Sequence, residues 1–265
     1  MSRNRALLTA TAASAALLAL TGCGSSGEAG GPGEEFGLVS GDTLTVATEG
    51  TYRPFSYHDE SGELVGYDVE VAEAVAENLG LEIAFQETQW DAIFAGLDAG
   101  RFDTIANQVT ITPEREDDYV FSTPYTVSTG VLVVAADNTD IKSFADLDGK
   151  TTAQSLTSNW KDLAEESGAK IEAVEGWAQA VALLEQGRVD ATINDSLTYL
   201  DYANTADASA IKVAAETDEE SQSAFTMTPE REALATAVDG ALDDLRADGT
   251  LAELGEKYFG EDVSE

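Results

Sequence analysis

The chain has 265 residues, enough for one or two domains, and its 43% hydrophobic content allows a packed core. Fifty acidic residues against 14 basic ones give a formal net charge of −36. Such a surface repels phosphate backbones and anionic lipid headgroups, which excludes nucleic acid as a partner and requires any membrane attachment to be covalent or inserted.

The N-terminus is typical of a targeting segment. Arg3 and Arg5 precede an apolar stretch at 6–20, which is too short to be a comfortable membrane span. The stretch ends in LTGC, which resembles a bacterial lipobox, and this resemblance implies cleavage after residue 22 and lipidation of Cys23. The alternative is a buried structural cysteine behind a simple secretory signal, but the position and the small neighbouring residues disfavour it. We therefore expect a signal peptide at 1–22 and a lipid anchor on the extracytoplasmic face of the cell membrane.

Residues 23–40 are dominated by Gly, Ser and Glu, which predicts a flexible tether, and the folded part is expected to begin near residue 41. Hydrophobic periodicity, glycine stops and turn residues then predict alternating strands and helices. The predicted order is strand 43–47, helix 67–79, strand 81–85, helix 91–99 and strand 102–106. This β-α-β-α-β order predicts a parallel sheet with helices on its faces.

An internal repeat comes next along the chain. WDAIFAGLDAGRFDTIAN at 90–107 and WAQAVALLEQGRVDATIN at 177–194 share five spaced identities, all 87 positions apart. The identical residues are Trp90, Gly100, Arg101, Asp103 and Asn107, matched by Trp177, Gly187, Arg188, Asp190 and Asn194. Strands at 150–154 and 170–174 flank a helix at 159–167 before the second copy. The sequence therefore predicts two similar α/β lobes with a cleft between them, and helices at 230–247 and 250–258 after the second lobe.

Loops at the ends of the predicted strands should face this cleft. Arg115 lies in the first turn of a helix capped by Thr112, where its positive charge opposes the helix dipole unless an anion binds there. Arg115 is thus a candidate carboxylate clamp, with pairing to Glu116 or Asp118 as the open alternative. Asp195 is a candidate ammonium partner, or equally the N-cap of the next helix.

The patterns of common enzymes and of transition-metal sites are not found. The chain has one histidine, His58, in a turn-like segment, and it contains no HExxH, GxSxG, GxGxxG or P-loop pattern. We therefore expect no metal, no cofactor and no chemistry. The expected oligomeric state is a monomer.

The chain resembles a family. GYDVEVA at 66–72 is similar to the signature of the family 3 extracellular solute-binding proteins, which bind polar amino acids for ABC importers. EGTYRPF at 49–55, ANQVTITPER at 106–115 and ADGTLAELGEKYFGED at 247–262 are also typical of it. The resemblance covers the chain from about Leu44 to its end.

The resemblance implies a two-lobed periplasmic-binding-protein fold of type II. Two hinge strands are expected to cross near 128–131 and 221–225. Lobe 1 would then comprise 41–128 and 222–265, and lobe 2 would comprise 129–221.

The resemblance also implies roles for individual residues. Arg115 would hold the α-carboxylate of the ligand and Asp195 its α-ammonium, and Glu49 would face its distal part. The remaining implied ligand-binding residues are Tyr52 and Trp90 as aromatic walls, Asn107, Gln108 and Thr110 in lobe 1, and Ser158 and Asn159 in lobe 2.

Within the family, EGTY, ETQWD, ANQV and AQSLTSNW together most resemble the cystine-binding branch. Tyr52, Trp90 and Trp160 would supply polarisable walls, which suit sulfur. The expected partners are an amino acid ligand and an importer permease. Two alternatives stay open, a receptor for another polar amino acid such as glutamine, and a secreted enzyme on the same fold such as a cyclohexadienyl-type dehydratase, for which Glu49 is the candidate acid.

Overall fold

The computed structural model describes residues 31–206 and 208–265. The predicted signal peptide at 1–22 and the predicted lipidation site Cys23 lie outside the described residues. Within the described ranges, no helix combines the length and the apolar character that a membrane crossing requires.

The first lobe, here called lobe 1, is built around a five-stranded sheet in the order β5-β1-β6-β13-β7. β1 pairs in parallel with β5 and β6, whereas β13 runs antiparallel to β6 and β7. The strands are β1 (Thr43–Thr48), β5 (Glu82–Glu87), β6 (Thr104–Ile105), β7 (Val120–Phe121) and β13 (Thr226–Met227). The helices are α2 (Tyr67–Asn78), α3 (Trp90–Asp98), α4 (Pro113–Glu116), α8 (Glu232–Asp248), which comes after a 3-10 turn at Pro229–Arg231, and α9 (Thr250–Phe259). A small sheet of β2 (Thr51–Tyr52), β3 (Ser56–His58) and β4 (Leu64–Val65) lies beside them.

The second lobe, lobe 2, is built around a sheet in the order β10-β9-β11-β8-β12. β9 pairs in parallel with β10 and β11, and β8 runs antiparallel to both β11 and β12. The strands are β8 (Thr126–Ala135), β9 (Thr151–Gln154), β10 (Lys170–Ala173), β11 (Ala191–Asp195) and β12 (Ile211–Ser223). The helices are α5 (Asn159–Glu166), α6 (Trp177–Glu185) and α7 (Ser196–Thr205), with 3-10 turns at Phe144–Leu147 and Ala208–Ala210.

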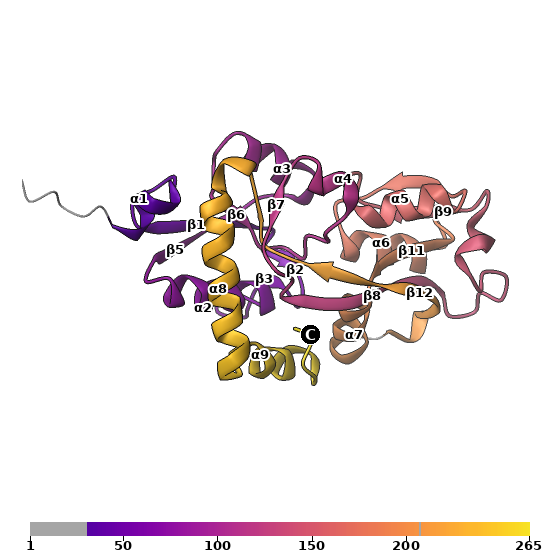
Figure 1. The fold of residues 1–265 in the computed structure, drawn as a ribbon. Coiled ribbons are helices and arrows are strands. Elements are labelled where there is room, and N and C mark those ends of the chain that lie inside the picture. Colours follow the sequence, from indigo (N-terminus) through magenta and orange to yellow (C-terminus); the bar gives the residue numbers. More distant parts are fainter. Residues whose placement is uncertain (1–30, 207) are drawn as a thin grey trace, which may run out of the picture.

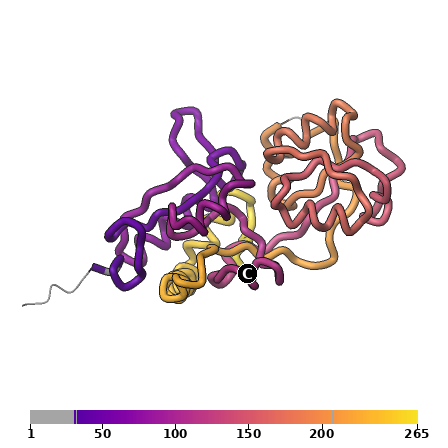
Figure 2. The backbone as a smooth tube through the Cα atoms, turned by 90° about the horizontal axis from the view of Figure 1, so that it is seen from above, coloured from indigo at the N-terminus to yellow at the C-terminus, as the bar shows by residue number. Residues whose placement is uncertain are grey.

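Two long strands connect the lobes. β8 and β12 pair from Thr126 and Ser223 at one end to Ala135 and Ile211 at the other, with register shifts between Val213 and Ala215 and between Glu216 and Glu220. Figure 1 shows both strands running side by side from lobe 1 into lobe 2, and Figure 2 shows the two bodies joined by them. The predicted two-lobed α/β fold with two hinge strands is confirmed.

The sheet of each lobe carries apolar clusters on both faces, and Leu197 of α7 also packs in the main cluster of lobe 1. In β8, Val131 and Val133 pack in the cluster that contains α6, whereas Leu132 and Val134 pack in the cluster on the opposite face. This separation arises from the alternation of side chains along a strand. Because β8 is apolar on both faces within lobe 2, it anchors that lobe firmly to the hinge.

The predicted tether at 23–40 is too long. Pro32–Phe36 form a short helix, α1, and Phe36 and Leu38 pack against the core of lobe 1. Arg231 donates a hydrogen bond to the Gly37 carbonyl at 2.5 Å, and the Val39 amide donates to Asp103 at 2.8 Å. The stretch is mostly Gly, Ser and Glu, but two of its apolar side chains pack on the core of lobe 1. The folded part therefore extends upstream of residue 41.

Candidate functional site

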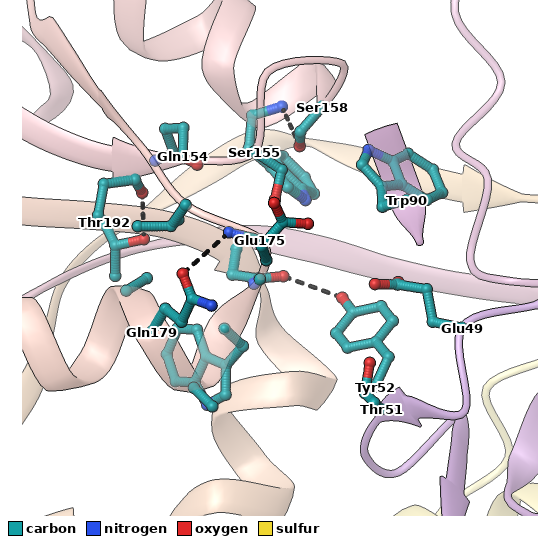
Figure 3. Close-up of a pocket in the computed structure, with 18 of the residues that line it drawn as sticks. Glu49, Thr51, Tyr52, Trp90, Gln154, Ser155, Ser158, Glu175, Gln179 and Thr192 are labelled. Atoms are coloured by element: carbon teal, nitrogen blue, oxygen red, sulfur yellow. Dashed lines mark hydrogen bonds between the residues drawn. The ribbon is translucent and has the colours of Figure 1, made fainter. Parts of the chain in front are cut away.

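A cavity of about 340 Å³ lies between the lobes and is shown in Figure 3. Lobe 1 contributes Glu49, Thr51, Tyr52, Gln89, Trp90, Asn107 and Gln108. Lobe 2 contributes Ala153, Gln154, Ser155, Ser158, Trp160, Val174, Glu175, Gly176, Trp177, Ala178, Gln179, Ala180, Thr192, Ile193 and Asn194. Most of these residues end a strand or come soon after one, which is where α/β lobes bind ligands.

Glu49 is held by the Asn107 side chain. The Asn107 Oδ1 atom accepts hydrogen bonds from the Glu49 amide at 2.8 Å and the Thr48 hydroxyl at 3.0 Å, and its Nδ2 donates to Glu49 Oε2 at 2.7 Å. Burial raises the pKa of the Glu49 carboxyl to about 7. The hydrogen bond from Asn107 opposes this rise, and the charges of Asp91 and Glu175 add to it. A carboxyl group that changes charge near neutrality therefore faces the cavity.

Gln108 is held in an unusual backbone conformation. Its φ of 50° is the one positive value at a non-glycine residue in the described ranges. The buried Asp68 carboxylate accepts hydrogen bonds from the Gln108 amide at 2.8 Å and from its Nε2 at 2.6 Å. Burial raises the pKa of Asp68 to about 7, and the hydrogen bonds from Gln108 oppose that rise. A left-handed residue held by two buried bonds is typical of a pre-organised binding site.

Aromatic side chains from both lobes enclose the cavity. The Tyr52 hydroxyl crosses from lobe 1 to lobe 2, where it donates to Asn194 Oδ1 at 3.0 Å and lies 3.0 Å from the Thr198 hydroxyl. Trp160 lies so close to the hinge strand that a Cβ atom on Gly130 would come within 2.4 Å of its ring. The absence of a side chain at Gly130 therefore allows the Trp160 ring to occupy its position in the cavity wall.

Several buried polar atoms of the lining are left without a partner. Among the residues that the structure describes, the unpartnered buried side-chain atoms include Trp90 Nε1, Gln108 Oε1, Gln154 Nε2 and Trp177 Nε1. All four residues line the cavity. Because an unsatisfied buried polar group is costly, these atoms favour a polar molecule in the cavity that can form hydrogen bonds with them.

Arg115 is the predicted carboxylate clamp, and it bridges the lobes beside the cavity. Its Nη1 donates to the Thr110 carbonyl at 2.8 Å within lobe 1, and its Nη2 donates to the Thr157 carbonyl of lobe 2 at 3.2 Å. Its guanidinium carbon is 5.6 Å from the centre of the Trp90 ring and 5.2 Å from that of Phe94. Burial lowers the pKa of Arg115 to about 10. The group stays charged, and it donates to carbonyl oxygens rather than to the surface acids near it in sequence.

Asp195 serves as the N-cap of α7, as its alternative interpretation held. One carboxylate oxygen accepts a hydrogen bond from the Leu197 amide at 2.9 Å, and the other accepts from the Ser128 hydroxyl at 2.5 Å. Burial raises the pKa of Asp195 to about 6, and these two hydrogen bonds oppose the rise. Each oxygen thus has one partner, and the carboxylate remains next to Asn194 at the edge of the cavity.

The structure brings together seven of the eleven predicted ligand-binding residues in the lining. They are Glu49, Tyr52, Trp90, Asn107, Gln108, Ser158 and Trp160. Within the described residues, Thr110, Arg115, Asn159 and Asp195 lie outside the lining. Sequence reasoning did not assign Gln154, Glu175, Trp177 or Gln179. The repeat that matches Trp90 with Trp177 was a signal for one of these, because both residues begin a helix and both line the cavity.

Two α/β lobes with a polar, aromatic cavity between them are the architecture of type II solute-binding proteins. Residues 44–261 match the model of the bacterial extracellular solute-binding proteins, family 3. The chain belongs to this family, which confirms the resemblance of the sequence.

Relatives and solved structures agree with this assignment. The L-cystine-binding protein TcyA of Bacillus subtilis is 53% identical over 222 residues, which are 83% of this chain and 82% of the relative. The unliganded, open L-cystine solute receptor of Neisseria gonorrhoeae is 48% identical with a TM-score of 0.58, covering 84% of this chain and 94% of that one. An ancestral arginine-binding protein bound to glutamine is 32% identical with a TM-score of 0.79, covering 84% and 100%.

One of these two solved structures is unliganded and open, and the other is bound to a ligand. The overlap is larger with the ligand-bound neighbour, although its sequence identity is lower. In this structure the two lobes are in contact with each other. The contacts between Tyr52 and Asn194 and between Arg115 and Thr157, and the ion pair of Arg53 with Asp201 at 3.6 Å, join the lobes in this arrangement.

Proposed function

We propose that this protein is the substrate-binding component of an ABC importer and captures L-cystine by closure of its lobes. The observation that carries the proposal is the inter-lobe cavity, whose lining holds four unpartnered polar side-chain atoms. The relatives named as L-cystine-binding proteins support the choice of ligand.

The chemistry of the lining supports the same ligand. Cystine has an apolar disulfide centre between two zwitterionic ends. Tyr52, Trp90 and Trp160 offer aromatic surface for the sulfur atoms, since sulfur makes favourable contacts with aromatic rings. The polar groups of Glu49 and Gln108 in lobe 1 and of Gln154 in lobe 2 offer hydrogen bonds on both sides of such a centre.

The test is a thermal-shift screen of the soluble domain against the common amino acids and L-cystine. A ligand that binds only the folded state raises the melting temperature by mass action. L-cystine is expected to give the largest shift at equal concentration. A larger shift with glutamine, the smaller rival, would contradict the choice of ligand while leaving a receptor for a polar amino acid.

Delivery to a permease requires that the protein stay at the membrane. We propose that Cys23 carries the lipid that anchors it on the extracytoplasmic face, where it acts as a monomer. Cys23→Ser is expected to release the protein from the membrane or leave it unprocessed, because the variant lacks the acceptor thiol. Membrane fractionation with labelled fatty acid checks this, and a mature-sized, lipid-labelled variant would refute it.

The buried Glu49 is the observation that favours an alternative function, that of an enzyme on the same fold. A buried carboxyl whose pKa is raised to about 7 is a suitable general acid, as a cyclohexadienyl-type dehydratase would need. We propose that the protein binds and releases its ligand without chemistry, so incubation with arogenate or prephenate is expected to yield no product. Turnover that Glu49→Gln abolishes would establish the enzyme instead.

A further inference from the structure

The charge of the cavity lining is entirely acidic. Its charged residues are Glu49 from lobe 1 and Glu175 from lobe 2, and no lysine or arginine belongs to it among the described residues. The two carboxyl groups are near enough for the charge of Glu175 to act on Glu49. They belong to different lobes, so closing the cleft brings like charges together.

Negative charges contributed to one cavity by both lobes oppose closure unless a cation lies between them, although Glu175 is exposed whereas Glu49 is largely buried. Asp91 adds a third negative charge that acts on Glu49. The charged Arg115 lies outside the lining, where it donates to two backbone carbonyls. An ammonium group of the ligand would remove the repulsion and add charge-assisted hydrogen bonds. The cleft should therefore close on a ligand that places an ammonium group between Glu49 and Glu175.

Gln154 provides the complementary group beside Glu175. It ends β9, pairs with Ala173 of β10, and its carbonyl accepts a hydrogen bond from the Val174 amide at 3.1 Å. Glu175 comes next at the end of the same parallel pair, and its own amide donates to Gln179 Oε1 at 3.2 Å, as Figure 3 shows. Gln154 is 3% exposed, and its Nε2 donor has no partner. A buried amide donor and a carboxylate, both at the ends of two paired strands in the lining, suit the carboxylate and the ammonium of an amino-acid head group.

We propose that Glu175 and Gln154 form a subsite in lobe 2 for the distal head group of a two-headed ligand. The distal ammonium lies between Glu175 and Glu49, and the distal carboxylate accepts from the Gln154 amide. This assignment rests on the proposed function, since L-cystine carries two such head groups. It adds a second point of recognition to the clamp that the sequence predicts at Arg115 and Asp195.

Three ligands can test the Glu175 contact and the Gln154 contact independently. L-cystine has both distal charges, the mixed disulfide of cysteine with cysteamine lacks the distal carboxylate, and that of cysteine with 3-mercaptopropionate lacks the distal ammonium. Titration calorimetry of the folded protein gives an affinity for each. Glu175→Gln and Gln154→Ala are compared with Glu172→Gln, which removes one exposed acid from β10 outside the lining.

Glu175→Gln is expected to weaken L-cystine and the cysteamine disulfide by roughly 10- to 100-fold, but the mercaptopropionate disulfide by no more than about twofold. Gln154→Ala should show the opposite selectivity between the two mixed disulfides, and Glu172→Gln should leave all three affinities unchanged. If the variants weaken all three ligands equally, or none, the subsite assignment is wrong while cystine binding stands. If the unaltered protein does not bind L-cystine, the proposed function itself is wrong.

Discussion

The two lobes contain the same structural unit, and they differ in the residue that comes directly after it. In each lobe a helix that begins with Trp leads through a glycine to a short strand. Gly100 and Gly187 both have a φ of 65°, a left-handed value that glycine adopts without a steric penalty. The repeated glycines therefore end the two helices in the same way.

The repeated aspartates also perform the same task. Asp103 Oδ2 accepts a hydrogen bond from the Thr45 amide at 2.8 Å, and Asp190 Oδ2 accepts one from the Thr151 amide at 2.8 Å. Each carboxylate thus holds the neighbouring strand of its sheet in register with the repeat. The scaffold of the two lobes is equivalent down to single hydrogen bonds.

The difference lies at the end of the repeat. In lobe 1 the next residue after Asn107 is Gln108, whose left-handed backbone is held by Asp68. In lobe 2 the next residue after Asn194 is Asp195, which caps α7. The repeated unit thus supplies the frame, whereas the residue after the strand decides which groups each lobe offers to a ligand.

The repeated aspartates should show the greatest contrast between the lobes. Asp103 is fully buried and forms an ion pair with Arg231 at 2.9 Å, whereas Asp190 is exposed. Asp103→Ala should therefore lower the free energy of unfolding by about 3–5 kcal/mol, because it leaves a largely buried charge without its partner. Asp190→Ala should cost about 1 kcal/mol, the value of an ordinary hydrogen bond. Urea denaturation measures both, and equal losses would mean that the frame of lobe 1 does not depend on the ion pair.

Substitution of one charged residue beside the cleft in each lobe tests what each lobe contributes to ligand affinity. Arg115→Ala and Asp195→Asn should each weaken ligand binding by about 2–5 kcal/mol, the cost of removing one partner of a buried charged contact. Asparagine is also a good N-cap, so Asp195→Asn removes the charge while keeping α7 capped. Calorimetry measures the affinities and thermal melting the stability. Affinities within a few-fold of the unaltered protein would exclude the predicted zwitterion clamp.

Substitutions at two glycines distinguish a contact in the cavity wall from a contact in the core. A Cβ at Gly130 would approach Trp160 within 2.4 Å, and one at Gly96 would approach Phe102 within 2.7 Å. Overpacking of this kind costs about 1–3 kcal/mol, so Gly130→Ala and Gly96→Ala should both lower the melting temperature. Only Gly130→Ala should also weaken ligand binding, because Trp160 lines the cavity and Phe102 does not. Equal affinities for both variants would show that Trp160 is not a wall of the site.

Changing the pH should also alter stability, and Glu49 of lobe 1 is one of three buried acids whose pKa is raised, beside Asp68 and Asp195. The folded pKa of Glu49 is raised to about 7 from an ordinary 4.5, so its contribution to stability is fully present below pH 4.5 and is lost as pH rises through 7. Burial is the main cause, opposed by Asn107 and reinforced by the charges of Asp91 and Glu175. The free energy of unfolding should therefore fall less steeply between pH 4.5 and 7 in Glu49→Gln. The difference in slope corresponds to the release of at most about one proton. Denaturation across this range checks it, and an unchanged slope would mean that Glu49 titrates at its ordinary pKa.

The frame could be predicted from the sequence because periodicity and glycine stops are local signals. The Thr112 cap of α4 and the strand–helix order of both lobes arise from them. Glu175, and a ligand-binding role for Gln154, were not predicted, because they depend on lobe closure and on which buried donors lack partners. The short helix at Pro32–Phe36 escaped because its stability comes from packing on distant residues rather than from its own composition.

Competition binding decides whether the cavity between the lobes is built for L-cystine. The folded protein, loaded with a labelled ligand, is titrated with L-cystine, glutamine, glutamate, histidine and arginine. We predict that L-cystine displaces the probe at far lower concentration than the other four, because its distal head group carries both an ammonium for the acidic groups and a carboxylate for the unpartnered donors. If any of those four binds about tenfold tighter than L-cystine, a gain of about 1.4 kcal/mol, the ligand assignment is contradicted.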